Sequence, residues 1–182
     1  AANILEKVTS SLLGNGGNDS ITAGDGANTI LGGFGNDTIT AGLGATSSNV
    51  VLGDNGELLY GAAGVLQTAR TTDTATATGG NDNITLGDGT NLVLGGVGSD
   101  TIKVGSGANT LLGDNGTVTY NTTGAAWIKD VTSTETTLGG DDSIAAGNGT
   151  NTILGGMGID SIAAGNGINT LLGDSGAISY SA

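Results

Sequence analysis

The sequence predicts an all-β chain wound into a parallel roll of about nine coils, with two flat sheets lying back to back. The first observation behind this fold class is a period of nine residues: GDGANTILG at 24–32 is followed by GFGNDTITA at 33–41. Glycine at alternate positions permits a tight turn with positive φ, and the polar and apolar alternation that follows is typical of a short strand. Two such units make one flattened coil, and stacked coils align their strands in parallel.

A longer period is superimposed on the short one. Residues 79–120 and 139–180 carry closely similar sequences with a shift of 60, and residues 16–60 carry an earlier copy shifted by 63. Such a period is typical of repeat architectures, whose units stack on their neighbours. We expect a single β-solenoid over 1–182, with three repeats of three coils each and no capping elements. The repeats are 16–78, 79–138 and an incomplete 139–182, and 1–15 would end an excursion of a preceding copy.

Two rows of branched apolar residues are expected to fill the roll. The first row contains Ile21, Ile39, Leu58, Ile84, Ile102, Val118, Ile144, Ile162 and Ile178. The second row contains Ile30, Val51, Val93, Leu111, Ile153 and Leu171. It has only two members per long repeat, because the third coil departs from the pattern and runs into Thr-rich excursions at 61–78 and 121–138.

Composition restricts the chemistry. Glycine supplies 37 of the 182 residues, and Pro, Cys and His are absent. Without Cys and His, the chain lacks disulfides, zinc sites of the usual N/S type, and thiol or imidazole catalysis, so we do not expect an enzyme. A net charge of -13 is the wrong sign for nucleic acid or an anionic membrane. No apolar run approaches the ~20 residues of a membrane span, so we do not expect membrane insertion.

Aspartates recur two residues before the buried Ile, on one edge of every regular coil. They are Asp19, Asp37, Asp82, Asp100, Asp142 and Asp160. Stacked parallel strands would bring these carboxylates within roughly 5 Å of one another, which is unfavourable unless cations lie between them. Carboxylate and turn carbonyl oxygens are hard ligands, and Mg²⁺ demands a more regular octahedral geometry. The row therefore predicts several Ca²⁺ ions along one edge.

The motifs that carry these aspartates resemble the RTX, or haemolysin-type, calcium-binding repeat with its signature GGxGxDxUx, in which U is a large apolar residue. Residues 32–40, 95–103 and 155–163 match the signature in full, and 16–22, 79–85 and 139–145 match it in part. The resemblance implies a parallel β-roll that binds Ca²⁺ through the signature aspartates and turn carbonyls. It also implies an extracellular or cell-surface location, export by a type I secretion system and folding outside the cell.

Two groups of residues depart from the signature. On the opposite edge, asparagine takes the place of aspartate, and we expect a hydrogen-bonded ladder there in preference to weak calcium ligands. In the third coils the acid stands two places earlier, at Asp54, Asp114 and Asp174. These three carboxylates either reach the same row of ions or form ordinary Asp-Gly turns.

The excursions carry most of the basic residues. Lys7, Arg70 and Lys129 lie there together with acidic residues and with Trp127, the single tryptophan. Two interpretations remain open for these segments. They form either a solvated flap or a lateral contact that bundles neighbouring rods.

The leading functional hypothesis is a calcium-stiffened structural segment of an extracellular bacterial fibre or giant surface adhesin. The alternatives are the C-terminal secretion and folding module of a secreted enzyme or toxin and, less favoured, an ice-binding roll. Val8 and Gly17 align with Val131 and Gly140 at a shift of 123, so appending a second copy after residue 182 continues the period. We therefore expect copies to join head to tail, in separate chains or in tandem. Nine coils at ~4.8 Å would give a rod ~43 Å long per chain.

Overall fold

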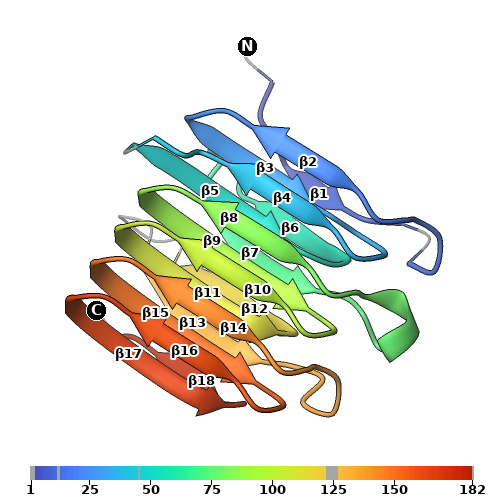
Figure 1. Ribbon diagram of the computed structural model, residues 1–182. Helices are drawn as coiled ribbons and strands as arrows, with labels where there is room; N and C mark the ends of the chain where they lie inside the picture. Colours follow the sequence, from blue (N-terminus) through green and yellow to red (C-terminus); the bar gives the residue numbers. More distant parts are fainter. Residues whose placement is uncertain (1–2, 12, 45, 122–126, 182) are drawn as a thin grey trace.

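The computed structural model describes residues 3–11, 13–44, 46–121 and 127–181. These residues form three six-stranded sheets and one short 3₁₀ turn, η1 (Thr76–Thr78). Two of the sheets are parallel and stack their strands in successive coils, as Figure 1 shows. The prediction of an all-β chain with a parallel β-roll is confirmed.

The roll consists of two parallel sheets that face each other. One sheet has the order β16-β14-β10-β8-β4-β2, and the other has the order β17-β15-β11-β9-β5-β3. The strands of the first sheet are β2 (Ser20–Ala23), β4 (Thr38–Ala41), β8 (Asn83–Leu86), β10 (Thr101–Val104), β14 (Ser143–Ala146) and β16 (Ser161–Ala164). The strands of the second are β3 (Ala27–Leu31), β5 (Ser47–Leu52), β9 (Gly89–Gly96), β11 (Gly107–Asp114), β15 (Gly149–Gly156) and β17 (Gly167–Asp174). Each coil is one strand of the first sheet followed by one of the second.

The interior of the roll contains the predicted apolar rows of the regular coils. Parallel pairing aligns Ile102 with Ile84 and Ile144 in one sheet, and Leu111 with Val93 and Ile153 in the other. All six of these side chains are at most 1% exposed. The rows face each other across the roll and form one continuous core.

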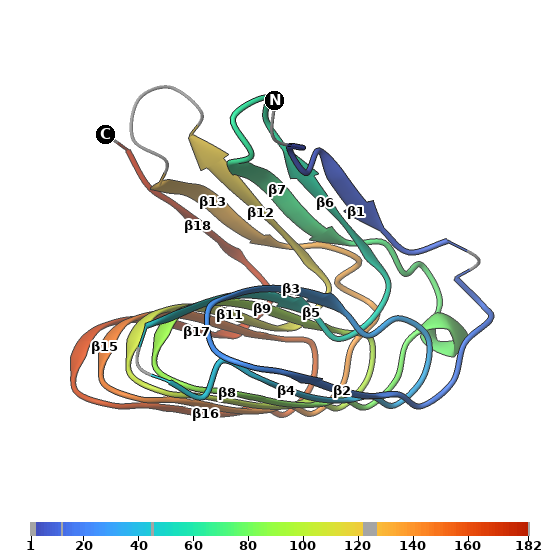
Figure 2. The ribbon, with the colours of Figure 1, turned by 90° about the horizontal axis from the view of Figure 1, so that it is seen from above.

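The third unit of each long repeat does not form a coil. Instead, these segments and their return strands build an antiparallel sheet with the order β1-β6-β7-β12-β13-β18. Its strands are β1 (Lys7–Thr9), β6 (Gly56–Tyr60), β7 (Leu66–Thr71), β12 (Gly116–Asn121), β13 (Trp127–Ser133) and β18 (Ala177–Ser179). Figure 2 shows this sheet, hereafter the hairpin sheet, rising at an angle from one face of the roll. The prediction of about nine coils is therefore wrong, because the described strands close six.

The reason lies in a second apolar row. The residue after each inward residue of the second parallel sheet is a leucine, and successive side chains of a strand point to opposite faces, so this leucine faces away from the roll interior. These leucines are Leu31, Leu52, Leu94, Leu112, Leu154 and Leu172. The hairpin sheet covers them, and Leu58, Val118 and Ile178 belong to this second core rather than to the roll interior. Burying this face stabilises the fold more than a third coil that would leave it in water.

The coil count also corrects the expected length. Six coils at ~4.8 Å give an axial rise of ~29 Å per chain, in place of ~43 Å. Each complete long repeat contributes two coils and one hairpin.

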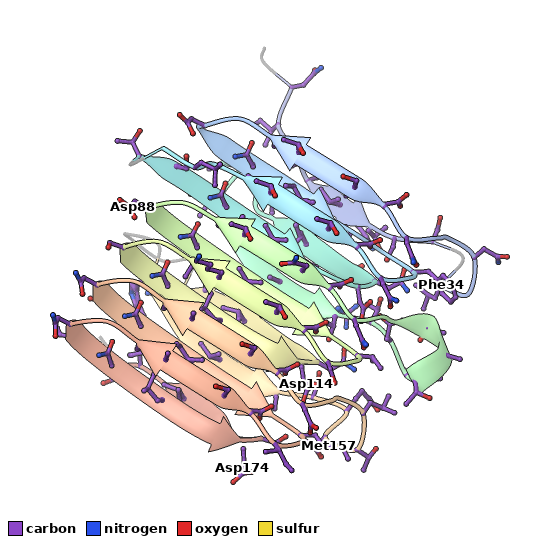
Figure 3. All side chains as sticks on the ribbon, in the orientation of Figure 1. Phe34, Asp88, Asp114, Met157 and Asp174 are labelled. Atoms are coloured by element: carbon purple, nitrogen blue, oxygen red, sulfur yellow. The ribbon has the colours of Figure 1, made fainter. Side chains whose placement is uncertain are left out.

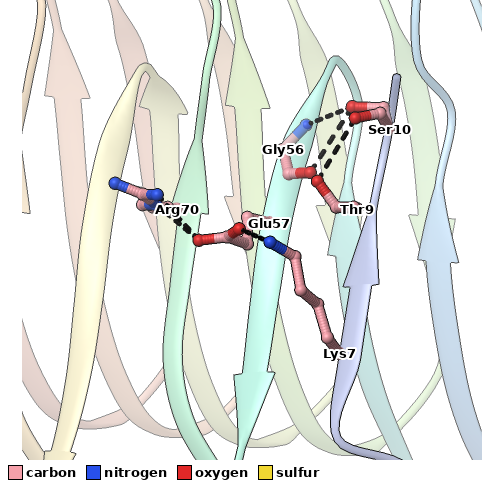
Figure 4. Close-up of polar contacts among 6 residues, drawn as sticks. All are labelled: Lys7, Thr9, Ser10, Gly56, Glu57 and Arg70. Carbon is pink, nitrogen blue, oxygen red and sulfur yellow. Dashed lines mark hydrogen bonds and ion pairs between the residues drawn. The ribbon is translucent and has the colours of Figure 1, made fainter.

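Charged and polar contacts hold the first strand of the hairpin sheet, as Figure 4 shows. Glu57 accepts hydrogen bonds from Arg70 Nε at 3.1 Å and Nη2 at 2.7 Å, and also pairs with Lys7 Nζ. Gly56 N–H donates to Ser10 Oγ at 2.9 Å. Two of the basic residues that the sequence assigns to a flap or a lateral contact thus bind a carboxylate of their own chain.

The hairpin sheet and the roll enclose a cleft of about 380 Å³ where they diverge. Trp127 and Ile128 line one side, and Thr110 and Thr152 of the roll line the other. Thr152 Oγ1 and the Tyr180 hydroxyl lie 2.7 Å apart and share a hydrogen bond across this cleft. Trp127 is therefore part of the junction between the two layers.

Candidate metal centre

The six predicted aspartates form one continuous row along an edge of the roll. Each stands one residue before a strand of the first parallel sheet, at the turn where the chain enters a new coil. Because the strands pair in register, the turns stack and bring the carboxylates of successive coils together. Asp37, Asp82, Asp100 and Asp142 are 1–2% exposed, whereas Asp19, in the first coil, is exposed.

One oxygen of each inner carboxylate has a fixed partner. The Oδ1 atom accepts the backbone N–H of the aspartate in the preceding coil, at 2.7 Å for Asp37, Asp82, Asp100 and Asp142 and 2.9 Å for Asp160. Each Asp backbone N–H is thereby tied to the next coil. One carboxylate therefore cannot move without breaking its hydrogen bond to the neighbouring coil.

The second oxygen of each inner carboxylate has no partner. The buried Oδ2 atoms of Asp37, Asp82, Asp100, Asp142 and Asp160 find no hydrogen-bond donor in the part of the chain that the structure describes. An ionised oxygen that is buried without a donor or a cation is strongly unfavourable. Five such atoms in one row require a positive ligand or a proton at each position.

A glycine packs closely against every one of these oxygens. A Cβ atom built on Gly32 would lie less than 3.0 Å from both Asp37 Oδ2 and the Gly53 carbonyl oxygen. The same arrangement recurs at the other four aspartates. The glycine, carboxylate and carbonyl sets are Gly53 with Asp82 and Gly95, Gly95 with Asp100 and Gly113, Gly113 with Asp142 and Gly155, and Gly155 with Asp160 and Gly173.

We call each of these sets a cradle. The two oxygens of a cradle approach the same glycine and lie at most ~5 Å apart, a separation that one Ca²⁺ beside the glycine would bridge with oxygen ligands at ~2.3–2.6 Å. Only glycine permits so close an approach, and the unpartnered carboxylate oxygen and the carbonyl oxygen are hard donors. The residues present therefore fit calcium, and each cradle lies between two adjacent coils.

The electrostatics of the row agree with this fit. Burial, with a contribution from neighbouring carboxylates, raises the pKa of Asp82 to about 7 and that of Asp142 to about 8. Burial also raises the pKa of Asp100 well above its ordinary value. When bound, Ca²⁺ supplies the positive charge that allows these carboxylates to be ionised inside the fold.

Two acids of the third units, Asp54 and Asp114, lie beside the aspartate row but accept hydrogen bonds from other residues. Asp54 Oδ2 accepts the Val97 N–H at 2.5 Å, while its buried Oδ1 has no partner in the described residues. Asp114 accepts the N–H groups of Met157 and, at 3.0 Å, Gly140. Burial and nearby Asp82 and Asp100 raise the pKa of Asp54 to about 10.

Both acids therefore tie the base of the hairpin sheet to a glycine turn of the following repeat. Figure 3 shows Asp114 next to Met157, and Asp174 on the same edge of the roll. Asp174 is exposed, and no such contact is found for it among the described residues. Asp54 and Asp114 thus hold turns of the following repeat, and their binding to the row of ions stays a prediction.

The opposite edge forms the predicted asparagine ladder. Each Nδ2 donates to the Oδ1 of the next coil at 2.8 Å, through Asn28, Asn49, Asn91, Asn109, Asn151 and Asn169. Most of these amides also donate to a turn carbonyl of their own coil, as Asn109 does to Gly105 at 3.1 Å. The ladder is satisfied without a metal.

The sequence predicted turn carbonyl ligands in general but did not identify the individual residues that supply them. The glycines lie at or next to the ends of strands of the second sheet, and the signal was the glycine that follows every outward leucine: Gly53, Gly95, Gly113, Gly155 and Gly173. Across the described residues, no group of three or more acidic side chains converges on a single point. An ion held at this edge would therefore take one carboxylate and draw further oxygens from the backbone.

Comparison of the sequence with models of protein families identifies this architecture. A family model described as the RTX calcium-binding nonapeptide repeat (four copies) matches residues 13–47, 70–102, 94–117, 136–162 and 154–177, together more than half of the chain. No curated protein and no solved structure matches it significantly. Within the described residues, no helix is long and apolar enough to cross a membrane.

A parallel roll with one carboxylate and one carbonyl oxygen converging between every pair of coils defines a calcium-binding repeat protein. The chain belongs to the RTX calcium-binding nonapeptide repeat family. These repeats bind Ca²⁺ at multiple sites, and they are typical of proteins secreted by type I systems.

Proposed function

We propose that this chain is a structural, non-enzymatic segment of an extracellular bacterial fibre or giant surface adhesin, stiffened by Ca²⁺ and stacked head to tail. The observation that carries this proposal is the match between the two ends of the roll. All three sheets have an open strand at each end, and the open strands are complementary. The proposed row of calcium ligands comprises the six signature aspartates, with Asp54, Asp114 and Asp174 beside it.

The backbone edges support this joint. The last strands β16, β17 and β18 each end a sheet, and the first strands β2, β3 and β1 begin the same three sheets. If the coil period continues, Ile162 pairs with Ile21 of the next copy and Asn169 with Asn28 of the next copy. In the hairpin sheet, Ile178 then pairs with Val8 of the next copy, as Val118 pairs with Val131 within the chain.

Side chains at the last coil are exposed in a way that a following coil would remove. Leu171 occupies the inward row next to Ile153, yet it is 46% exposed while Ile153 is 0% exposed. Burying such a leucine contributes about 1.5–3 kcal/mol. Unpaired parallel edges also template pairing with a further strand.

The ladders give the joint a direction. Asparagine Nδ2 always donates towards the later coil's Oδ1, so Asn169 offers a donor at one end and Asn28 offers an acceptor at the other. The aspartate row runs likewise, from the N–H of one coil to the Oδ1 of the next. Two equivalent ends would bring two donors or two acceptors together, so only head-to-tail stacking satisfies both ladders.

Asp174 supplies a specific test position. Asp54 and Asp114 accept N–H groups from Val97 and Met157, and the residue that corresponds to these in the first repeat is Phe34. Phe34 and Asp174 lie near opposite ends of the rod in Figure 3. Continuation of the period places Asp174 against the Phe34 N–H of the next copy, whether that copy is a separate chain or part of a longer polypeptide.

Electron microscopy and sedimentation of the 182-residue chain in calcium test the proposal. We expect unbranched rods with an axial rise of ~29 Å per chain. Asp174→Ala should shorten the rods, whereas Asp88→Ala, on the opposite edge in Figure 3, should leave their length unchanged. A folded chain that stays monomeric at millimolar calcium would contradict the proposal and favour a secretion and folding module of a secreted enzyme or toxin.

A further inference from the structure

The cleft between the hairpin sheet and the roll gathers aromatic side chains, which are scarce in the rest of the chain. Figure 2 shows the two layers meeting at the base of the hairpin sheet and diverging towards the side where the C terminus lies. The chain has one Trp, three Tyr and one Phe, and two of these, Trp127 and Tyr180, line the cleft. Its volume of about 380 Å³ lies within the ~300–1,000 Å³ of small-molecule sites. The cleft is therefore large enough to hold a ring of a ligand.

The repeat itself does not require an aromatic residue at position 127. In β7 and β13, one residue pairs with the tyrosine of the strand before it, and these residues are Leu66 and Ile128. The residues that precede them, Val65 and Trp127, therefore hold equivalent places in two repeats. Val65 is 42% exposed. A valine is thus enough to build the hairpin, and the indole of Trp127 adds a broad apolar face at the cleft.

The opposite wall of the cleft supplies hydroxyl groups from the roll. Thr110 lies on β11, and Thr150 and Thr152 lie on β15. Thr152 Oγ1 and the Tyr180 hydroxyl share one hydrogen bond at 2.7 Å, so both oxygens keep capacity for a further partner. Among the described residues that line the cleft, none is charged. An aromatic face on one wall and hydroxyl groups on the other suit an uncharged ligand that has both kinds of surface.

We propose that this cleft is a binding site for an uncharged polysaccharide, with one sugar ring stacked on Trp127 and its hydroxyl groups directed towards Thr150 and Tyr180. The C–H groups on one face of a sugar ring carry a slight positive charge and pack against the negative face of an indole. The hydroxyl groups at the rim of the ring donate and accept hydrogen bonds, as threonine and tyrosine hydroxyls do. The net charge of -13 disfavours an anionic polysaccharide, and no carboxylate lines the cleft in the described residues to hold a cationic one.

This inference goes beyond the structural role proposed above, because it gives the segment a carbohydrate partner. It requires only one folded chain, since every lining residue belongs to the same copy. A failure of the site would therefore leave head-to-tail stacking standing, and a failure of stacking would leave the site.

The test is a titration of the 182-residue chain, dilute and at saturating calcium, with maltohexaose, cellohexaose and mannohexaose. Trp127 is the single tryptophan, so its fluorescence reports directly on the cleft. We expect at least one of the three oligosaccharides to shift the emission, with half-saturation at about 1 mM. The apolar probe 1-hexanol, which has no ring and a single hydroxyl group, should give no saturable shift.

Three variants separate the cleft from its surroundings. Trp127→Val copies the residue of the first repeat and should weaken binding about tenfold, measured by saturation-transfer NMR. Tyr180→Phe keeps the ring, removes the hydroxyl group and should weaken binding about threefold. Tyr60→Phe is the matched control, because Tyr60 lies outside the cleft and its hydroxyl lies 3.3 Å from Thr29 Oγ1. All four proteins should give the same β-sheet signal in circular dichroism.

The outcomes that would overturn the inference are specific. No saturable shift with any of the three oligosaccharides at about 10 mM would exclude the site. A saturable shift with 1-hexanol alone would make the cleft a site for an apolar ligand instead. Equal binding of an oligosaccharide to the wild type, Trp127→Val and Tyr180→Phe would place the sugar elsewhere on the chain.

Discussion

The two edges of the roll carry almost the same side chain in the same stacked geometry, yet the buried polar atoms of the two edges differ in whether they find hydrogen-bond partners. On one edge an amide both donates and accepts, so along the ladder from Asn28 to Asn169 each amide donates to the next one at 2.8 Å. On the other edge a carboxylate only accepts, so one oxygen per coil is left without a partner. Replacing NH₂ with O⁻ converts a self-sufficient ladder into one that depends on a cation.

The largest effect should come from removing calcium. With excess chelator at pH 7.5, the buried carboxylates have neither cation nor donor, and we expect the β-sheet signal in circular dichroism to be lost over the whole chain. Mg²⁺ at equal concentration should not restore it, because Mg²⁺ retains its water and requires octahedral geometry. Full retention of the signal in chelator would mean that the asparagine edge and the two cores are enough to keep the chain folded without calcium.

Acidification should reverse part of that loss. In the calcium-free fold the pKa values of Asp82 and Asp114 are about 7 and that of Asp142 is about 8, all raised from 3.8 mainly by burial. A raised pKa means that the folded chain binds more protons than the unfolded chain. The contribution of these aspartates to the stability of the calcium-free fold is therefore fully present below pH ~3.8 and is lost as the pH rises through 7–8.

The chelated protein should consequently regain β-sheet signal at pH 5, which is still above its pI of about 4.1, and lose it at pH 9. In the presence of calcium the same groups should release protons on binding, which a weakly buffered titration can record. Equal signals at pH 5 and pH 9 in chelator would show that the aspartate row does not control folding.

Exchanging the side chains between the two edges sharpens the comparison. Asn109→Asp places a charge, at a position 2% exposed, opposite the Asn151 Oδ1 that it formerly served as donor. We expect a loss of about 3–5 kcal/mol in the free energy of unfolding at saturating calcium, measured by urea denaturation. The matched change Asp100→Asn should instead raise the calcium concentration needed for folding, and a similar calcium dependence for both variants would remove the distinction between the edges.

The smallest effect is expected at the third-unit acids. Asp114→Asn keeps one acceptor oxygen but cannot accept from both Gly140 and Met157 as a carboxylate does. We expect a loss of about 1–2 kcal/mol in the free energy of unfolding, with little change in calcium stoichiometry. The exposed Asp174→Asn is the control in dilute monomer, and a loss of a whole ion in Asp114→Asn would make Asp114 a ligand.

Much of this comparison was accessible from the sequence, since period and side-chain type determine which residues stack. The two parallel sheets, the inward rows and both polar edges follow from the nine-residue unit, because in-register stacking repeats every position. The hairpin sheet did not follow, because Leu58 and Val118 fit the inward row by spacing while belonging to the second core. Its cause was visible in the outward leucine of each regular coil, such as Leu112, which two sheets alone would expose.

The cradles needed coordinates, since a carbonyl oxygen leaves no trace in residue type. The glycine pattern indicates tight turns, but only the backbone path shows that Gly113 directs its carbonyl towards the carboxylate of Asp100. The same holds for Asp54, whose distance from the signature position gave no indication that it accepts the Val97 N–H.

The most direct test is a crystal structure grown with calcium, with anomalous differences measured at a long X-ray wavelength. We expect peaks at the five cradles between Gly32 and Gly173, each between two coils and in contact with a signature aspartate, and no peak along the asparagine ladder. Peaks along Asn28 to Asn169, or an aspartate edge without any, would contradict this expectation.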